Sequence, residues 1–166
     1  MTHLAKEVRR VSRRIIGIDP GTGILGFGVI DVERGKTKLV DAGVVRTKPK
    51  QPLEDSLLEI HDSLKEIIET NKPQEMVIEK LFFAQNVTTA ISVAHARGVA
   101  MLAGKQANLK IAEYTPLQIK QSLTGYGRAT KQQVQEMVKI SLGLKEVPKP
   151  DDCADALAAA IMHSGS

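Results

Sequence analysis

Short apolar runs that end in proline, glycine or acidic residues constrain the fold of this chain most strongly. The run Arg14–Asp19 is followed by Pro-Gly, and the runs Ile24–Val32 and Leu39–Thr47 come after gaps of only a few residues. Runs of this length that are bounded by turn residues are typical of buried strands. Because consecutive strands joined by short turns pair as a meander, we expect three antiparallel strands at the start of the fold.

The rest of the chain alternates helical periodicity with two further short apolar runs. These runs, Glu75–Glu79 and Lys110–Tyr114, predict the fourth and fifth strands. Five helices are expected. Two begin at Pro52 and at Pro116, and three span Asn86–Ala107, Thr130–Leu142 and Asp151–His163. Thr130 and Gln133 would form a capping box at the start of the fourth helix. This order predicts an α/β domain with a mixed five-stranded sheet flanked by helices.

The composition is that of an ordinary globular domain. The chain has 166 residues, of which 42% are hydrophobic and 25% charged, and a domain of this size buries a core without disulfides. The single cysteine, Cys153, excludes a disulfide framework and a cysteine-based zinc site, and fits a reducing cytoplasmic location. No apolar run reaches about 18 residues, so we expect no membrane span.

Charge is distributed unevenly along the chain. The first fourteen residues hold five basic residues and one acid, which accounts for the net charge of +4. We therefore treat residues 1–14 as a basic N-terminal extension and residues 15–166 as a single domain. Residues 54–79 carry eight acids and two lysines, whereas residues 105–149 carry eight basic residues and three acids. A basic face that binds nucleic acid and ordinary solvated helix surfaces both fit this pattern.

Four acids stand where the expected strands end and where the last helix begins. Asp19 and Glu79 each close an apolar run, and strand ends in open α/β sheets are a usual place for catalytic groups. Asp19 also fits a turn residue before Pro20, and Glu79 also fits an ordinary strand-end charge. Asp152 and Asp155 are three residues apart, so they share one face of the helix.

Together the four carboxylates would suit divalent cations. Like charges held close together repel unless a cation lies among them, and carboxylate oxygens favour Mg²⁺ or Mn²⁺. Two such ions about 4 Å apart can hold the attacking and leaving oxygens of a phosphodiester. The pattern therefore indicates metal-dependent phosphodiester hydrolysis, with two Mg²⁺ ions in each active site.

Six short motifs follow one another between residues 14 and 163. They are Gly17-Ile18-Asp19-Pro20-Gly21, Ile78-Glu79 with Phe82-Phe83, Ala96-Arg97-Gly98-Val99, Gln118-Ile119-Lys120-Gln121, Gly125-x-Gly127-x-Ala129-x-Lys131, and Asp152-x-x-Asp155-Ala156-Leu157. Each motif alone is a weak signal, but six in this order are highly specific. In this order they resemble the RuvC family, the bacterial Holliday-junction resolvases.

The resemblance implies a ribonuclease H-like fold and a homodimer. It also implies an endonuclease of DNA recombination and repair that nicks two opposed strands of a four-way junction and requires Mg²⁺. The family's catalytic, metal-binding acids would fall on Asp19, Glu79, Asp152 and Asp155, and its RuvA and RuvB branch-migration proteins would be partners. The helix expected over Asn86–Ala107 is rich in small residues, which suits either a dimer interface or packing on the sheet.

Phe82, Lys120, Arg128 and Lys131 are the candidate DNA contacts. Phe82 follows Glu79 closely in a chain with only three phenylalanines and two tyrosines, and it suits either stacking on an unpaired base or the core. The three basic residues lie in the basic segment. Lys131 falls in the first turn of a helix, which disfavours a cation but attracts phosphate. A solvated lysine is the alternative there.

Two other functions fit part of the pattern. The glycine-rich run 17–23 also resembles the first phosphate loop of actin-like ATPases and sugar kinases. Those proteins need a second Asp-x-Gly-Thr loop, which this sequence lacks. The other alternative is a junction-binding protein without cleavage, against which the complete set of four acids argues.

Overall fold

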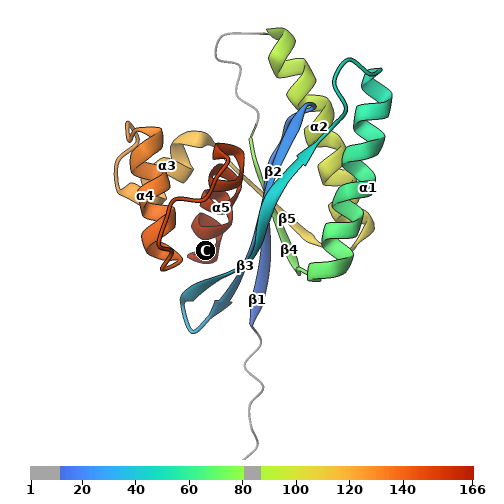
Figure 1. Cartoon of the computed structure of the whole chain (residues 1–166). Coiled ribbons are helices and arrows are strands. Elements are labelled where there is room, and N and C mark those ends of the chain that lie inside the picture. Colours follow the sequence, from blue (N-terminus) through green and yellow to red (C-terminus); the bar gives the residue numbers. More distant parts are fainter. Residues whose placement is uncertain (1–11, 81–86) are drawn as a thin grey trace, which may run out of the picture.

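A five-stranded sheet between two layers of helices forms the domain (Figure 1), and the computed structural model describes residues 12–80 and 87–166. Strands β1 (Arg13–Asp19), β2 (Ile24–Glu33) and β3 (Lys36–Arg46) form an antiparallel meander. Strands β4 (Glu75–Glu79) and β5 (Lys110–Tyr114) extend the sheet in parallel on the other side of β1. The strand order β3-β2-β1-β4-β5 confirms the predicted mixed sheet.

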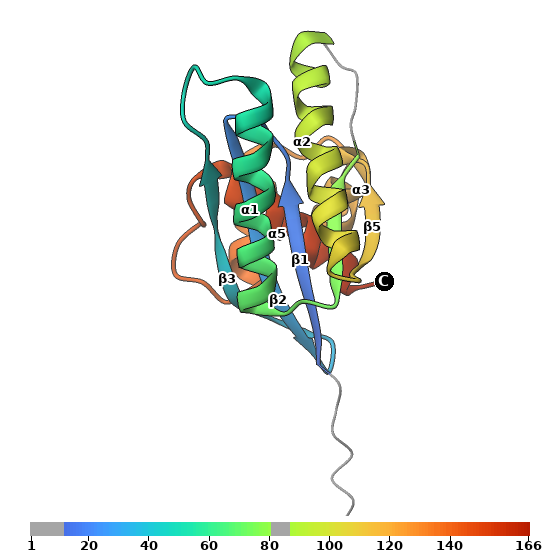
Figure 2. The ribbon, with the colours of Figure 1, turned by 90° about the vertical axis from the view of Figure 1, so that its right-hand side faces the viewer.

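The helices cover the two faces of the sheet. Helices α1 (Leu53–Asn71) and α2 (Val87–Gln106) lie side by side on one face (Figure 2). Helices α3 (Pro116–Thr124), α4 (Lys131–Ser141) and α5 (Asp151–Ser164) cover the other face. Among the residues that the structure describes, no helix is both long and apolar enough to cross a lipid bilayer.

Side chains of the central strands alternate between the two layers. Ile18 and Ile78 are buried in the core beneath α1 and α2, whereas Val77 belongs to the core beneath α3, α4 and α5. Successive residues of a strand point to opposite faces of a sheet. Asp19 and Glu79 therefore lie on the face that α5 covers.

Helix α5 approaches the sheet closely because glycines face it. A Cβ atom on Gly17 would collide with the backbone of Ala156, and one on Gly26 would collide with the backbone of Asp152. Any side chain at these two positions would therefore push α5 away from the sheet. The close contact places the first turns of α5 against the ends of β1 and β2.

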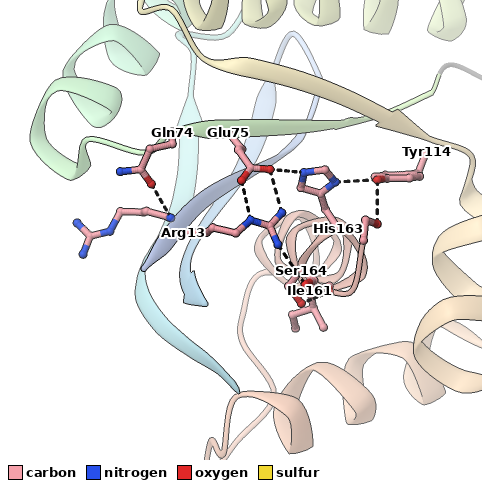
Figure 3. A network of polar contacts seen from close by, with 9 residues as sticks. Arg13, Gln74, Glu75, Tyr114, Ile161, His163 and Ser164 are labelled. Carbon is pink, nitrogen blue, oxygen red and sulfur yellow. Dashed lines mark hydrogen bonds and ion pairs between the residues drawn. The ribbon is translucent and has the colours of Figure 1, made fainter. Parts of the chain in front are cut away.

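A polar network fixes the other end of α5 to the start of β4 (Figure 3). Arg13 Nε donates to Glu75 at 2.8 Å, His163 Nε2 lies 2.6 Å from the second Glu75 oxygen, and the Tyr114 hydroxyl lies 2.7 Å from His163 Nδ1. The hydrogen bond from Arg13, supported by the one to His163, lowers the pKa of Glu75 to about 2. The two ends of α5 are thus held by different contacts: hydrogen bonds and ion pairs at this end, and close backbone packing at the other.

The first strand begins earlier than expected. The predicted strand starts at Arg14 and the predicted basic extension ends there, but β1 starts at Arg13. Both arginines pair with acids of the sheet, Arg13 with Glu75 and Arg14 with Asp31. The expected boundary at residue 14 therefore falls inside the strand, because these two charges have partners within the domain.

Small residues of α2 pack inside the domain. Ala96 and Ala100 are fully buried in the core beneath α1 and α2. A Cβ atom on Gly104 would lie 2.7 Å from the sulfur of Met76 on β4. These small residues of α2 therefore pack on the sheet, which is one of the two roles expected for them.

Candidate active site

Four acids from three elements gather at one end of the sheet. Asp19 ends β1 and Glu79 ends the neighbouring parallel strand β4. Asp152 and Asp155 come from the first turns of α5, which the glycine contacts hold against the same end. Each of the other three acids influences the titration of Asp19. The structure therefore brings together all four acids that the sequence singled out.

Burial and crowding raise the pKa of Asp19 to about 8. Burial is the largest cause, and the negative charges of Asp155, Glu79 and Asp152 add to it. Hydrogen bonding with the Asp152 side chain raises the pKa of Asp19 further, as the smallest of these causes. This end of the sheet therefore holds more negative charge than is stable without a proton or a cation.

Lysines oppose the charge of the other two acids of the site, Glu79 and Asp155. Burial raises the pKa of both acids; Asp155 adds to the increase at Glu79, whereas Lys120 and Lys131 counteract it. Lys131 Nζ lies 3.5 Å from Asp155 and 3.3 Å from Asp151. Glu79, Asp155 and both lysines line a pocket of about 230 Å³, so acids and cations border the same space.

A capping box places Lys131 at the start of α4. The backbone amide of Gln133 donates to the Thr130 hydroxyl at 3.2 Å, and the backbone amide of Thr130 donates to the side-chain oxygen of Gln133 at 2.8 Å. These two hydrogen bonds confirm the predicted capping box. The ion pair with Asp155 offsets the unfavourable position of a cation at a helix N-terminus. Sequence reasoning missed this pair because nothing in the sequence indicates how α4 faces α5.

The remaining candidate DNA contacts stay predictions. Lys120, on α3, lines the pocket beside Glu79. Arg128 is exposed in the turn before α4 and does not line that pocket. Phe82 lies outside the described residues.

The acids suit a divalent cation in chemistry but are not closed around a point. Within residues 12–80 and 87–166, no three acidic, histidine or cysteine side chains converge as a metal cage. The negative charges of Asp155, Glu79 and Asp152 all act on Asp19, and that of Asp155 acts on Glu79, so the four acids are electrostatic neighbours. All the donors are carboxylate oxygens, which Mg²⁺ and Mn²⁺ prefer. Binding would thus require rotation of side chains that are already neighbours.

The fold and this acidic edge define a nuclease domain of the ribonuclease H-like class. A family model described as crossover junction endodeoxyribonuclease RuvC matches residues 15–163. A relative of the same description from Fusobacterium nucleatum is 52% identical over 153 residues, which cover 92% of this chain and 80% of the relative. Another, from Brevibacillus brevis, is 52% identical over 151 residues, 91% of each chain. The chain belongs to the RuvC family.

Solved structures agree with this assignment. The structure of Thermus thermophilus RuvC in complex with a Holliday junction substrate superposes with a TM-score of 0.87 at 37% identity, covering 92% of this chain and 93% of that chain. The yeast mitochondrial Holliday junction resolvase superposes with a TM-score of 0.67 at 14% identity, covering 92% and 78%, which shows a shared fold alone. The predicted ribonuclease H-like fold and the resemblance to RuvC are confirmed.

Proposed function

We propose that this chain is a Holliday-junction resolvase in which Asp19, Glu79, Asp152 and Asp155 carry the metal-dependent hydrolysis of DNA. Membership in a family of crossover junction endodeoxyribonucleases supports the reaction. The T. thermophilus relative in complex with a Holliday junction supports the substrate. One observation carries the residue assignment: the four carboxylates meet at one end of the sheet, where burial and like charge raise the pKa of Asp19 to about 8.

Mg²⁺ is the cofactor that we propose, with Mn²⁺ as a substitute and two ions in each active site. The four carboxylates would hold the ions. When bound, such ions activate a water molecule and neutralise the negative charge on the leaving oxygen. The crowding of acids supports this proposal, because a divalent cation relieves the repulsion that raises the pKa of Asp19.

Basic residues beside the acids would bring the DNA backbone to the site. Lys120 and Lys131 oppose the charge of Glu79, so they reduce the repulsion that a phosphate meets at the pocket. Arg128 is exposed in the turn before α4 and would extend this contact. Phe82 would stack on a base that is unpaired at the junction.

Paired nicks on opposed strands require two active sites, so we propose a homodimer. Helix α2 supports it with apolar and small residues that are exposed and recur on one helix face, namely Val87, Ile91, Ala94, Gly98 and Leu102. A two-fold axis would place this stripe against its copy. Sedimentation at micromolar concentration is expected to give twice the chain mass of 18.0 kDa.

Family membership also supports two further proposals about the cell. RuvA and RuvB branch-migration proteins would be the partners of the resolvase. The cytoplasm would be its location, since the DNA junction is its substrate. Co-purification of RuvA or RuvB with the chain on junction DNA is the expected observation, and its absence with active resolvase would contradict the partner assignment.

A nicking assay on a synthetic four-way junction tests the proposed function. With Mg²⁺, the wild-type chain is expected to cut two opposed strands symmetrically. Asp19→Asn is expected to abolish cleavage but to bind the junction as tightly or more tightly, because one carboxylate no longer repels the phosphates. Junction binding without cleavage in both Mg²⁺ and Mn²⁺ would favour the binding protein instead, and nucleotide hydrolysis without junction binding would favour the phosphate-loop alternative.

A further inference from the structure

Arg97, on α2, reaches the end of β4 from the face of the sheet opposite α5. Its Nε donates to the backbone carbonyl of Glu79 at 3.2 Å, and a terminal guanidinium nitrogen pairs with Glu113 on β5. The Arg97 side chain is only 17% exposed, and that of Glu113 is 32% exposed. The guanidinium therefore joins the ends of two strands, one of which carries a catalytic acid.

The sheet itself leaves this carbonyl without a donor. The Lys80 amide donates to the Tyr114 carbonyl of β5 at 2.7 Å. The Glu79 carbonyl belongs to the same trans peptide group as this amide and points the opposite way, toward β1. Gly17 pairs with Val77 and Ile18 with Ile78 in the parallel ladder. The next donor in this ladder would be residue 20, which is a proline and has no N–H. Arg97 supplies the missing hydrogen bond.

We propose that Arg97 is a positioning residue for the hydrolysis, acting through the backbone of Glu79. The inference rests on the catalytic role proposed above for Glu79. Because the carbonyl and the side chain share one residue, holding the carbonyl fixes where the Glu79 carboxylate stands relative to Asp155. Arg97 belongs to the layer of α1 and α2, whereas the acids lie on the face of α5. It therefore influences the reaction without contacting the pocket.

A second contact from α2 holds the chain beyond the other strand of the site. The hydroxyl groups of Ser92 and Thr22 lie 2.6 Å apart, and Thr22 stands in the turn that follows Asp19. The Thr47 hydroxyl also donates to the Thr22 carbonyl at 2.7 Å. Helix α2 thus contacts the last residue of β4 and the turn just past β1, so one helix holds both strand ends that carry acids.

The variant Arg97→Met tests the proposal because it keeps the length of the side chain and removes every donor. Since a misplacement of about 1 Å can lower a rate about 100-fold, we expect the single-turnover cleavage rate to fall about 10- to 100-fold. We also expect a higher Mg²⁺ concentration at half-maximal rate, with the Kd for junction DNA within about twofold of wild type. Arg97→Lys keeps the positive charge but gathers its donors on a single nitrogen, without the planar fork that reaches Glu79 and Glu113 together, so an intermediate rate is expected.

Arg14→Met is the matched control. Like Arg97, Arg14 bonds to one acid and one backbone carbonyl, but at the opposite end of the sheet. It pairs with Asp31 at 2.7 Å and donates to the Asn71 carbonyl at 2.7 Å. Its loss is expected to lower the melting temperature comparably and to leave the cleavage rate of the folded protein unchanged. If Arg97→Met, or Arg97→Lys where the former does not fold, lowers only the melting temperature, Arg97 is merely structural and the proposal is wrong.

Glu79→Gln, measured in the same assay, separates this proposal from the one on which it rests. Cleavage by Glu79→Gln at the wild-type rate would contradict the catalytic role of Glu79, and the positioning role would fail with it. An inactive Glu79→Gln together with Arg97→Met at the wild-type rate and wild-type Mg²⁺ dependence would overturn the positioning role alone. An inactive Glu79→Gln with a slow, Mg²⁺-demanding Arg97→Met supports both.

Discussion

Glu75 and Glu79 stand at the two ends of the same five-residue strand, β4. The two environments shift the pKa of these glutamates in opposite directions. At the first end, Arg13 and His163 pair with Glu75 and lower its pKa to about 2. At the other end, burial and the charge of Asp155 raise the pKa of Glu79. The charge of Glu75 therefore stabilises the fold, whereas the charge of Glu79 destabilises it.

The same contrast runs along α5, which spans both ends of the sheet. Its last turn carries His163 as part of the network around Glu75. Its first turns carry Asp152 and Asp155 against Asp19 and Glu79. A cluster of like charges lowers the stability of the folded domain, so other contacts must offset it, and functional sites commonly show this trade-off. The ion pairs around Glu75 thus stabilise the same helix, α5, whose first turns carry two of the clustered acids.

The largest expected effect concerns the pH dependence of stability at the acidic end. Asp19 has its pKa raised from 3.8 to about 8, so the folded state binds a proton that the unfolded chain releases above about pH 4. Stability without divalent cations should therefore fall by about 2–4 kcal/mol between pH 4 and pH 8. Denaturant unfolding across this range should show the fall in the wild type and a much smaller one in Asp19→Asn. Equal slopes for the two proteins would contradict the crowding of acids.

Moving α5 away from the sheet should weaken the acidic end next. In Gly26→Ala the new methyl group would collide with the Asp152 backbone, so we expect a loss of about 1–3 kcal/mol in stability and a reduced cleavage rate. Gly23→Ala is the control, because a Cβ atom there meets nothing within 4 Å. Unfolding and nicking assays on both variants measure the effect, and similar behaviour would exclude close packing as the cause of the site geometry.

The smallest expected effect comes from the lysines that oppose the acids. Replacing Lys131 by Ala should weaken junction binding for every DNA sequence and reduce the slope of log affinity against log salt concentration by about 1. Lys65→Ala, on α1 at the opposite face, should leave that slope unchanged. Titrations at several salt concentrations measure both, and an unchanged slope in Lys131→Ala would show that Lys131 serves only its ion pair with Asp155.

Much of the fold could be predicted because its signals are local. The five strands and five helices expected from the sequence are present, with limits that differ by a few residues, and the Thr130–Gln133 capping box is confirmed. The two strand-end acids and the pair on α5 could be singled out for the same reason. A strand end or a helix start is encoded within a few residues of itself.

The contacts between elements could not be predicted in this way. The Lys131–Asp155 pair, the Gly26 contact with α5 and the Arg97 bond to Glu79 each join segments that are distant in sequence. Arg97 falls within a recognised motif, but only the register of β1 and β4 shows why a donor is needed there. The early start of β1 at Arg13 likewise depends on its partner Glu75, on another strand.

The matched variants Glu79→Gln and Glu75→Gln test the central claim most directly, since the two glutamates end the same strand. Single-turnover nicking of a four-way junction in Mg²⁺ and the free energy of unfolding are measured for both. We predict that Glu79→Gln loses cleavage with its stability kept or increased. Glu75→Gln should keep the cleavage rate of the folded protein and lose about 1–3 kcal/mol of stability. Cleavage retained in Glu79→Gln, or abolished in folded Glu75→Gln, would contradict the division of the sheet into a catalytic end and a structural end.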